Sequence, residues 1–125
     1  MFSLKQWQRS REWKNWVGYE TAQPERKLSP SSVTELQDII KKARIDKKRI
    51  RVTGAAHSFS GCAKPEEIAI SLHHMRGLIS VDKAAKLATL HAGTYLYEIG
   101  EALKEHGLAL ENMGDVQAQT LAGSV

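Results

Sequence analysis

Hydrophobic residues between positions 32 and 44 recur at the spacing of one helical face. Ser32 stands just before this run and Glu35 follows three residues later, which is the capping-box arrangement of a helix start. The pattern predicts a helix over residues 32–44. Its apolar face comprises Val33, Leu36, Ile39, Ile40 and Ala43.

Short runs rich in β-branched and aliphatic residues follow this helix and predict strands. The first run stops at Gly54, so a strand leads directly into a loop of small residues. The polar segment 82–86 separates the last two runs and has the length of a hairpin turn. The predicted strands are residues 49–53, 68–72, 78–81 and 87–92.

Helical spacing returns after residue 94, where Leu96, Ile99 and Leu103 share one face. Thr94 is the expected N-cap, and Gly107 stands where a helix-ending glycine belongs. One more short strand is expected at 108–110. Because helices alternate with pairs of strands, the pattern favours an α+β fold over a doubly wound sheet of regular βαβ units.

The two ends of the chain differ from its middle. Pro24 and Pro30 interrupt any regular element, so residues 1–30 are predicted to be a lead-in segment and residues 31–125 the N-terminal part of a domain. The tail from residue 112 onward is small and polar and stops in mid-pattern, so the chain is expected to be truncated.

All three tryptophans, Trp7, Trp13 and Trp16, lie in the lead-in segment. Trp13, Trp16 and Val17 are at helical spacing, which leaves an amphipathic helix lying on a membrane surface as an alternative. The apolar stripe is short and is interrupted by polar residues.

Composition narrows the class of protein. The chain has 125 residues, of which 42% are hydrophobic and 26% charged, as expected for one ordinary globular domain. No apolar segment approaches the roughly 18 residues of a membrane-spanning helix. Cys62 has no second cysteine to pair with and the N-terminus lacks a signal-peptide pattern, so a cytoplasmic location is expected.

The net charge of +4 is unevenly distributed, with the excess of lysine and arginine in the first 51 residues. The densest basic stretch is residues 41–51, which could attract phosphates. One interpretation is a stand-alone module that binds an anionic nucleotide or nucleic acid. The other is a solvated helix end, where cations complement the helix dipole and need no partner.

The loop after the first predicted strand has the composition of a ligand-binding turn. Its small residues allow close approach to the backbone, whose consecutive N–H groups can form an anion-binding concavity, and its hydroxyls add donors. Phosphate is a reasonable ligand, although many such loops are only tight turns. The loop comprises Gly54, Ala55, Ala56, His57, Ser58, Phe59, Ser60 and Gly61.

His57 gives this loop a chemically reactive group, because a neutral imidazole among small residues can act as a nucleophile or a base. The alternative is a histidine that only hydrogen-bonds within the loop. His73 and His74 are adjacent, so in a strand they would point to opposite faces, and one cysteine with scattered histidines does not support a zinc site.

Seven segments of the chain carry a resemblance to a known family. They are Trp13–Gly18, Pro30–Leu36, Arg49–Ser60, Leu72–Asp82, His91–Thr94, Leu103–Leu110 and Asn112–Gly123. Taken in order, they resemble the flavin-linked oxidases of the vanillyl-alcohol oxidase superfamily, whose FAD-binding domain is of the PCMH type. The resemblance is strongest to the sugar-1,4-lactone oxidase and alditol oxidase branch, and it covers residues 13–125.

This resemblance implies the N-terminal subdomain of a PCMH-type FAD-binding domain, with FAD as cofactor and the diphosphate held by residues 54–61. His57 stands where this branch often has a histidine joined covalently to the flavin. In the intact family protein a polyol or sugar-lactone substrate passes a hydride to flavin N5, and oxygen or another acceptor reoxidises the flavin. A second flavin-contacting segment would contribute Gly114, Asp115, Gln119, Thr120, Ala122 and Gly123.

Family members continue beyond the point where this chain stops. The rest of their FAD domain and a separate substrate domain are absent here, so no catalytic residue can be carried over and this chain alone is expected to be inactive. Besides the nucleotide-binding alternative, a third hypothesis is an assembly fragment whose exposed sheet edge pairs with another copy.

Overall fold

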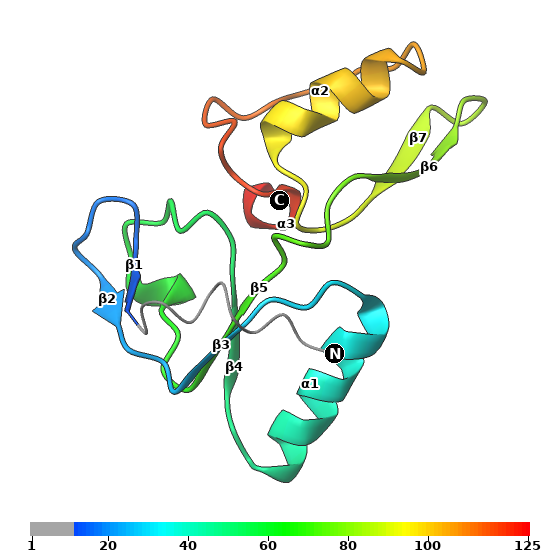
Figure 1. The fold of residues 1–125 in the computed structure, drawn as a ribbon. Helices are drawn as coiled ribbons and strands as arrows, with labels where there is room; N and C mark the ends of the chain where they lie inside the picture. Colours follow the sequence, from blue (N-terminus) through cyan, green and yellow to red (C-terminus); the bar gives the residue numbers. More distant parts are fainter. Residues whose placement is uncertain (1–11) are drawn as a thin grey trace.

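Three parallel strands form the sheet at the centre of one half of the molecule (Figure 1). The computed structural model describes residues 12–125. The sheet consists of β3 (Arg26–Leu28), β4 (Ile50–Thr53) and β5 (Ile68–Ser71), in the order β3–β5–β4. β5, the central strand, is the most apolar of the three, and its first three residues are buried.

Helix α1 (Val33–Ile45) joins β3 to β4 and packs on the sheet. The predicted helix is confirmed, with the Ser32 hydroxyl accepting the Glu35 N–H at 3.1 Å. The Glu35 carboxylate accepts from the backbone N–H of Ser31 at 2.7 Å rather than from that of Ser32. This bond and one from the Ser31 hydroxyl lower the pKa of Glu35. The first hydrophobic core comprises Leu28, Ile39, Ala43, Ile68 and Ile70.

The first thirty residues contain strands that the sequence did not predict. β1 (Trp13–Lys14) pairs with β2 (Thr21–Ala22), and β3 lies between Pro24 and Pro30. A three-residue strand is long enough to pair with β5 and short enough to fit between two prolines, which is why the prolines did not exclude it.

The alternative of an amphipathic helix at Trp13, Trp16 and Val17 is wrong for these residues. Trp13 belongs to β1 and is 6% exposed, while Trp16 and Val17 lie in the turn that follows. A tryptophan that packs inside the molecule is not presented to a membrane surface. Trp7 lies outside the described residues.

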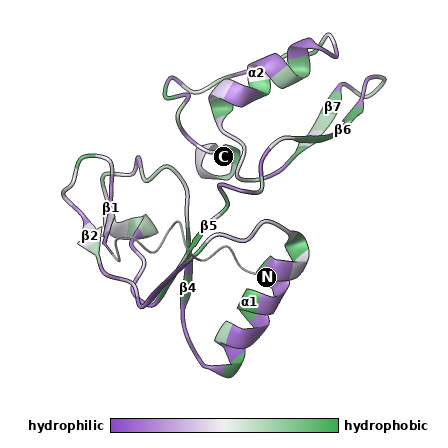
Figure 2. Ribbon diagram, viewed as in Figure 1, coloured by the Kyte–Doolittle hydropathy of each residue, from purple (hydrophilic) through white to green (hydrophobic). Residues whose placement is uncertain are grey.

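The other half of the molecule contains the hairpin of β6 (Leu78–Asp82) and β7 (Leu87–Leu90) and helix α2 (Leu96–Lys104). The predicted hairpin is confirmed. Both helices alternate between hydrophilic and hydrophobic colours along their lengths, as amphipathic helices do (Figure 2). The second core comprises Leu96, Ile99 and Leu103, with Leu78, Ala88, Leu90, Leu108, Leu110 and Leu121 packed against them.

Two details of this half correct the sequence expectations. Thr94 is not the N-cap of α2: it is fully buried, its hydroxyl donating to the His91 carbonyl at 2.6 Å and accepting from the Gly77 N–H at 2.9 Å. The helix begins one residue later, after Tyr95. Residues 108–110 form no strand, because the apolar side chains of this irregular segment pack on α2 instead of pairing with a sheet.

Two short helices complete the structure, the 3-10 turn η1 (Gly61–Ala63) and α3 (Leu121–Ser124). The mixture of helices and strands confirms the predicted α+β class, with one local difference: β3, α1 and β4 form a parallel crossover in which β5 lies between the two strands. Over residues 12–125, no helix has the length and apolarity to cross a membrane.

Candidate functional site

The loop of residues 54–61 is held by the N-terminal segment. The Trp16 N–H donates to the Ala56 carbonyl at 2.9 Å, and the Asn15 side-chain amide donates to the Ser58 carbonyl at 3.1 Å. Ala56 has φ +57°, a left-handed conformation that a non-glycine residue rarely adopts. The buried side chain of Asn15 fixes the path of a loop that lies more than forty residues away in the sequence.

The hydroxyls of this loop bond to one another. The Ser58 hydroxyl lies 3.1 Å from that of Ser60 and 3.2 Å from the Cys62 sulfur, and it accepts the Ser60 N–H at 3.2 Å. Hydrogen bonding from Ser58 and then Ser60 lowers the pKa of the exposed Cys62 thiol. The loop is thus a set of clustered donors with exchangeable partners, suited to an anionic ligand.

His57 lies half-buried in the same loop and packs against an aromatic residue. Its imidazole is stacked on the Trp16 ring, with centroids 5.7 Å apart and planes 25° from parallel. Phe59 meets the same tryptophan edge-on at 5.3 Å. Within residues 12–125 the His57 ring nitrogens make no hydrogen bond, so the imidazole keeps both nitrogens available for chemistry.

The segment of residues 117–123 forms a second wall, held by the main chain. The N–H groups of Leu96 and Tyr97 donate to the carbonyls of Gln119 and Gln117, at 2.9 and 3.1 Å. In return, the N–H groups of residues 121 and 122 donate to the carbonyls of Thr94 and Ala92, at 2.7 and 3.2 Å. This segment is therefore anchored to the residues that lead into α2.

The two walls line one open cavity of about 210 Å³. A second cavity, of about 200 Å³, adjoins it and shares Val52, Gly54, Thr120 and Gly123 with it. A Cβ at Gly54 would lie 2.7 Å from the Thr120 hydroxyl, so glycine permits the two walls to meet there. The first cavity is lined by Val52, Gly54, Ala55, Ala56, His57, Ser58, Cys62, Ala63, Gln119, Thr120 and Gly123.

The structure brings together most, but not all, of the candidate residues. Ala122 lines the second cavity. Phe59, Ser60, Gly61, Gly114 and Asp115 line neither of the two cavities, and Gly114 packs instead near Gln119 and Leu96. The tip of the loop and the start of the C-terminal segment thus lie beside the cavity walls.

Other residues of the site carried no signal in the sequence. Cys62 and Ala63 of η1 line the first cavity. Ser71, the last residue of β5, and the segment of Ala92 and Gly93 line the second. Asn15 and Trp16 could have been suspected only from their place in a segment that resembles the family. Nothing in the spacing of the residues relates them to the loop.

His73 and His74 are also placed differently from the expectation. They lie in a turn rather than a strand, with their rings 5.3 Å apart, so the argument that they face opposite sides is wrong. His73 Nδ1 lies 3.1 Å from the Tyr95 hydroxyl, and burial, followed by the charge of Arg76, lowers its pKa. In the described part of the chain, no three His, Cys, Asp or Glu side chains are grouped so as to hold a metal ion.

The basic stretch 41–51 is divided among ion pairs. Lys48 pairs with Glu25 at 2.8 Å and with Glu67 at 3.5 Å, and Arg49 pairs with Glu67 at 3.1 Å and with Glu66. Lys42 pairs with Asp46 at 3.2 Å at the end of α1. The positive charges that would attract a polyanion are thus partly neutralised by neighbouring carboxylates.

The fold and the cavity together define a cofactor-binding domain, in which two segments distant in sequence meet around small residues and an available imidazole. Residues 24–125 match the family described as FAD binding domain. The chain belongs to this family, and FAD is the cofactor of the domain.

Two relatives are similar in sequence to this chain over most of its length. One is the L-gulono-1,4-lactone dehydrogenase of Mycobacterium tuberculosis, 33% identical over 90% of this chain and 26% of its own length. Another is the L-gulonolactone oxidase of Mus musculus, 33% identical over 91% of this chain and 26% of its own length. The chain thus spans about a quarter of the length of these relatives.

A solved structure supports the fold. The crystal structure of cholesterol oxidase from B. sterolicum superposes with a TM-score of 0.77 at 19% identity, over 90% of this chain and 22% of that one. The resemblance to the PCMH-type flavin oxidases and to the sugar-lactone branch is confirmed by these comparisons. The alternative of a nucleic-acid-binding module has no support in them.

The residues of the site fit FAD. Gly54 has no Cβ where the two walls approach each other, and Ala56 turns the backbone through a left-handed conformation beside clustered hydroxyls. Such a cradle of small side chains and clustered hydroxyls suits the diphosphate of a dinucleotide. The aromatic rings of Trp16 and Phe59 lie beside it.

Proposed function

We propose that the chain is the N-terminal FAD-binding portion of an oxidoreductase that oxidises the CH–OH group of a sugar lactone or a polyol. The observation that carries this proposal is the cavity that residues 54–58 line together with residues 119, 120 and 123, which are more than sixty positions away in the sequence. The names of the relatives support a lactone as the substrate class.

Each wall has a role in this proposal. The backbone of residues 54–58 and the Ser58 hydroxyl would hold the diphosphate, with the Ser60 hydroxyl bonded to that of Ser58, while Gln119, Thr120 and Gly123 line the opposite side. When bound, FAD supplies a two-electron acceptor for the hydride of the substrate carbinol. The residues of this chain bind and orient that cofactor, and the substrate would be held by parts of the protein beyond this chain.

His57 is the residue proposed to become covalently attached. Its imidazole lines the cavity and has no hydrogen-bond partner within residues 12–125, so a ring nitrogen is available to form a bond to the flavin 8-methyl carbon. In this attachment the N–H bond of His57 and one C–H bond of the flavin methyl group would break and an N–C bond would form. The two electrons and two protons released would pass through the cofactor to oxygen, which would be the final oxidant.

Absorbance and mass measurements on the full-length gene product test two proposals, that the protein binds FAD and that His57 is the residue attached to it. The purified protein should show flavin absorbance, and its mass under denaturing conditions should exceed the sequence mass by one FAD. His57→Ala should abolish the added mass, while the control His106→Ala, in the turn after α2, should leave it unchanged. A full-length product that takes up no FAD would overturn the proposal.

The substrate class is tested with the same protein. Anaerobic addition of a 1,4-lactone or a polyol should bleach the visible flavin absorbance, and the substrate that bleaches it fastest identifies the class. Oxygen uptake compared with reduction of an artificial acceptor then separates an oxidase from a dehydrogenase. No bleaching with either class would contradict the proposed substrate.

A further inference from the structure

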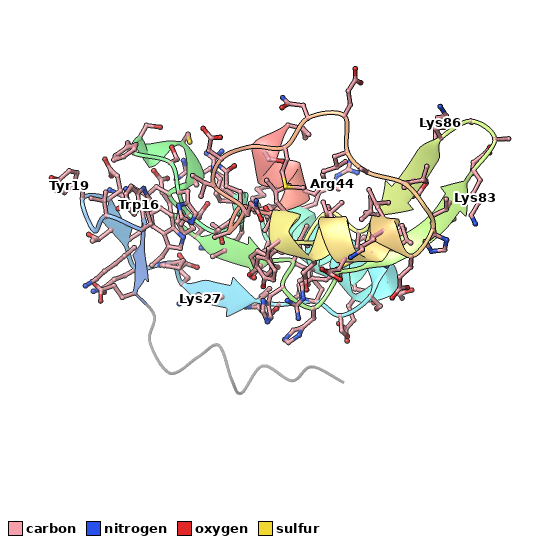
Figure 3. The ribbon with its side chains drawn as sticks, turned by 90° about the horizontal axis from the view of Figure 1, so that it is seen from above. Trp16, Tyr19, Lys27, Arg44, Lys83 and Lys86 are labelled. Carbon is pink, nitrogen blue, oxygen red and sulfur yellow. The ribbon has the colours of Figure 1, made fainter. Side chains whose placement is uncertain are left out.

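Trp16 contacts the loop of residues 54–61 but does not belong to it. The residue lies in the turn between β1 and β2, and Figure 3 places it with Tyr19 at the opposite end of the molecule from Lys83 and Lys86 of the β6–β7 hairpin. Its ring stacks on the His57 imidazole and also meets Phe59. The tryptophan is thus the common partner of two side chains of the loop.

Within residues 12–125, no hydrogen bond sets the plane of the His57 ring. A functional histidine is usually oriented by a hydrogen bond from one ring nitrogen to a carbonyl or carboxylate. No such bond exists here within residues 12–125, whereas the stack with Trp16 has near-parallel planes. The orientation of the imidazole therefore depends on the stack and on the backbone.

The backbone of the loop depends on the same segment. The N–H of Trp16 donates to the carbonyl of Ala56, the residue just before His57. Asn15 holds the Ser58 carbonyl just after it, and Asn15 is itself fixed by bonds to Glu20, at 3.0 Å through its backbone N–H and 3.1 Å through its side chain. The peptide before His57 is thus tied to Trp16, and the peptide after Ser58 is tied to Asn15.

The exposure of Trp16 argues against a purely structural role. The side chain is 55% exposed, unlike the neighbouring Trp13, so it contributes only part of its surface to packing. The Trp16 ring stacks on one face of the His57 imidazole, which lines the cavity. The stack leaves the edge of the imidazole, which carries both nitrogens, uncovered.

We propose that Trp16 is a positioning residue for His57, which makes the segment 12–20 part of the flavin site. The stack holds the imidazole in one plane, in which its ring nitrogens are accessible from the cavity. This inference rests on the proposed function, because it assigns a role in attachment of FAD at His57.

The first test needs no cofactor. In the chain with labelled histidine, ring protons stacked on a tryptophan are shielded, so Trp16→Leu should move the His57 ring-proton resonances downfield and leave the other four histidines unchanged. Trp16→Phe, which keeps an aromatic face, should give an intermediate shift. The matched control is Tyr19→Leu, which removes an 80% exposed aromatic residue from the same segment. Unchanged His57 resonances in Trp16→Leu would overturn the inference.

The second test measures attachment in the full-length gene product. Trp16→Leu should slow the appearance of denaturation-resistant FAD by about 2- to 10-fold, the range expected for losing one aromatic pair. Trp16→Phe should retain most of the rate and Tyr19→Leu all of it. If the leucine variant does not fold, the graded response of the phenylalanine variant decides the question.

The two hypotheses fail differently. If the unsubstituted protein acquires no covalent FAD, the attachment proposed for His57 is wrong, and with it the role of Trp16 in attachment. If covalent FAD forms normally in the folded Trp16→Leu protein, the positioning role alone is wrong, and His57 keeps its proposed function.

Discussion

The two walls of the flavin cavity are held in place in different ways. The wall formed by residues 54–58 is irregular and is supported largely by Asn15 and Trp16. The second wall, formed by residues 117–123, is supported by main-chain hydrogen bonds to residues 92–97, which lead into α2. One wall depends on which side chains are present elsewhere, and the other depends on the course of the backbone.

Because their supports differ, different substitutions should disrupt the two walls. A side-chain substitution at residue 15 or 16 removes a contact from the first wall without changing any residue of the loop. We expect the second wall to tolerate side-chain changes on its exposed residues but to be lost if the backbone at residues 92–97 is displaced. The predictions below separate these two kinds of support.

Gly93→Ala should break the second wall. A Cβ at this buried position would overlap the Leu72 carbonyl oxygen and lie 2.7 Å from that of Met75, and neither backbone group can turn aside. We expect a loss of about 3 kcal/mol in the free energy of unfolding, because displaced backbone costs at least as much as an overpacked core. Urea denaturation of the apo chain measures it.

Gly100→Ala is the matched control for this substitution. Gly100 lies in α2 with no atom within 4 Å of the position of a Cβ, so alanine there should stabilise the chain by about 0.5–1 kcal/mol through its higher helix propensity. Equal effects of the two substitutions would contradict the view that Gly93 supports the wall.

Asn15→Leu should break the first wall. It removes the donor to the Ser58 carbonyl and leaves the Glu20 N–H without its acceptor in a part-buried site, which we expect to cost about 2 kcal/mol. The loop should also become cleavable by protease at residues 54–61, while the segment 117–123 stays protected. Asn112→Leu, on an exposed loop, should change neither property.

The point where the walls touch allows a finer test. Gly54→Ala should cost about 1 kcal/mol, because its Cβ would lie 2.7 Å from the Thr120 hydroxyl, which can turn away at the expense of its rotamer. Thr120→Ala removes the obstacle, so the double variant should be more stable than the sum of the two single effects predicts. Strict additivity in this double-mutant cycle would show that the walls do not meet there.

Elements set by neighbouring residues could be predicted from the sequence. The cap at Ser32 and the hairpin turn at 82–86 are local patterns, and the structure has both α1 and the β6–β7 hairpin where they were expected. The loop at 54–61 was recognisable for the same reason: a strand ends at a glycine and small residues follow. The family resemblance then supplied the cofactor.

Features that depend on tertiary contacts could not be predicted. β3 is a strand because β5 pairs with it, and its own three residues carry no strand signal between two prolines. Thr94 was expected to cap α2 because it precedes an apolar run, but packing turns its hydroxyl toward residues 77 and 91. The stack of Trp16 on His57 joins residues 41 positions apart, a distance over which no periodicity operates.

The tie between Asn15 and Ser58 also sets an order of events during synthesis. The two residues are 43 positions apart, so at about 5–20 residues per second the ribosome makes Asn15 some 2–9 s before its partner. A two-stranded ribbon such as β1–β2 is at best marginally stable alone in water, and its bonds to the loop cannot form before residues 56–58 have been made. We therefore expect the first described part of the chain to be made to reach its final contacts only after the loop has been made, with Trp13 and Trp16 accessible to chaperones until then.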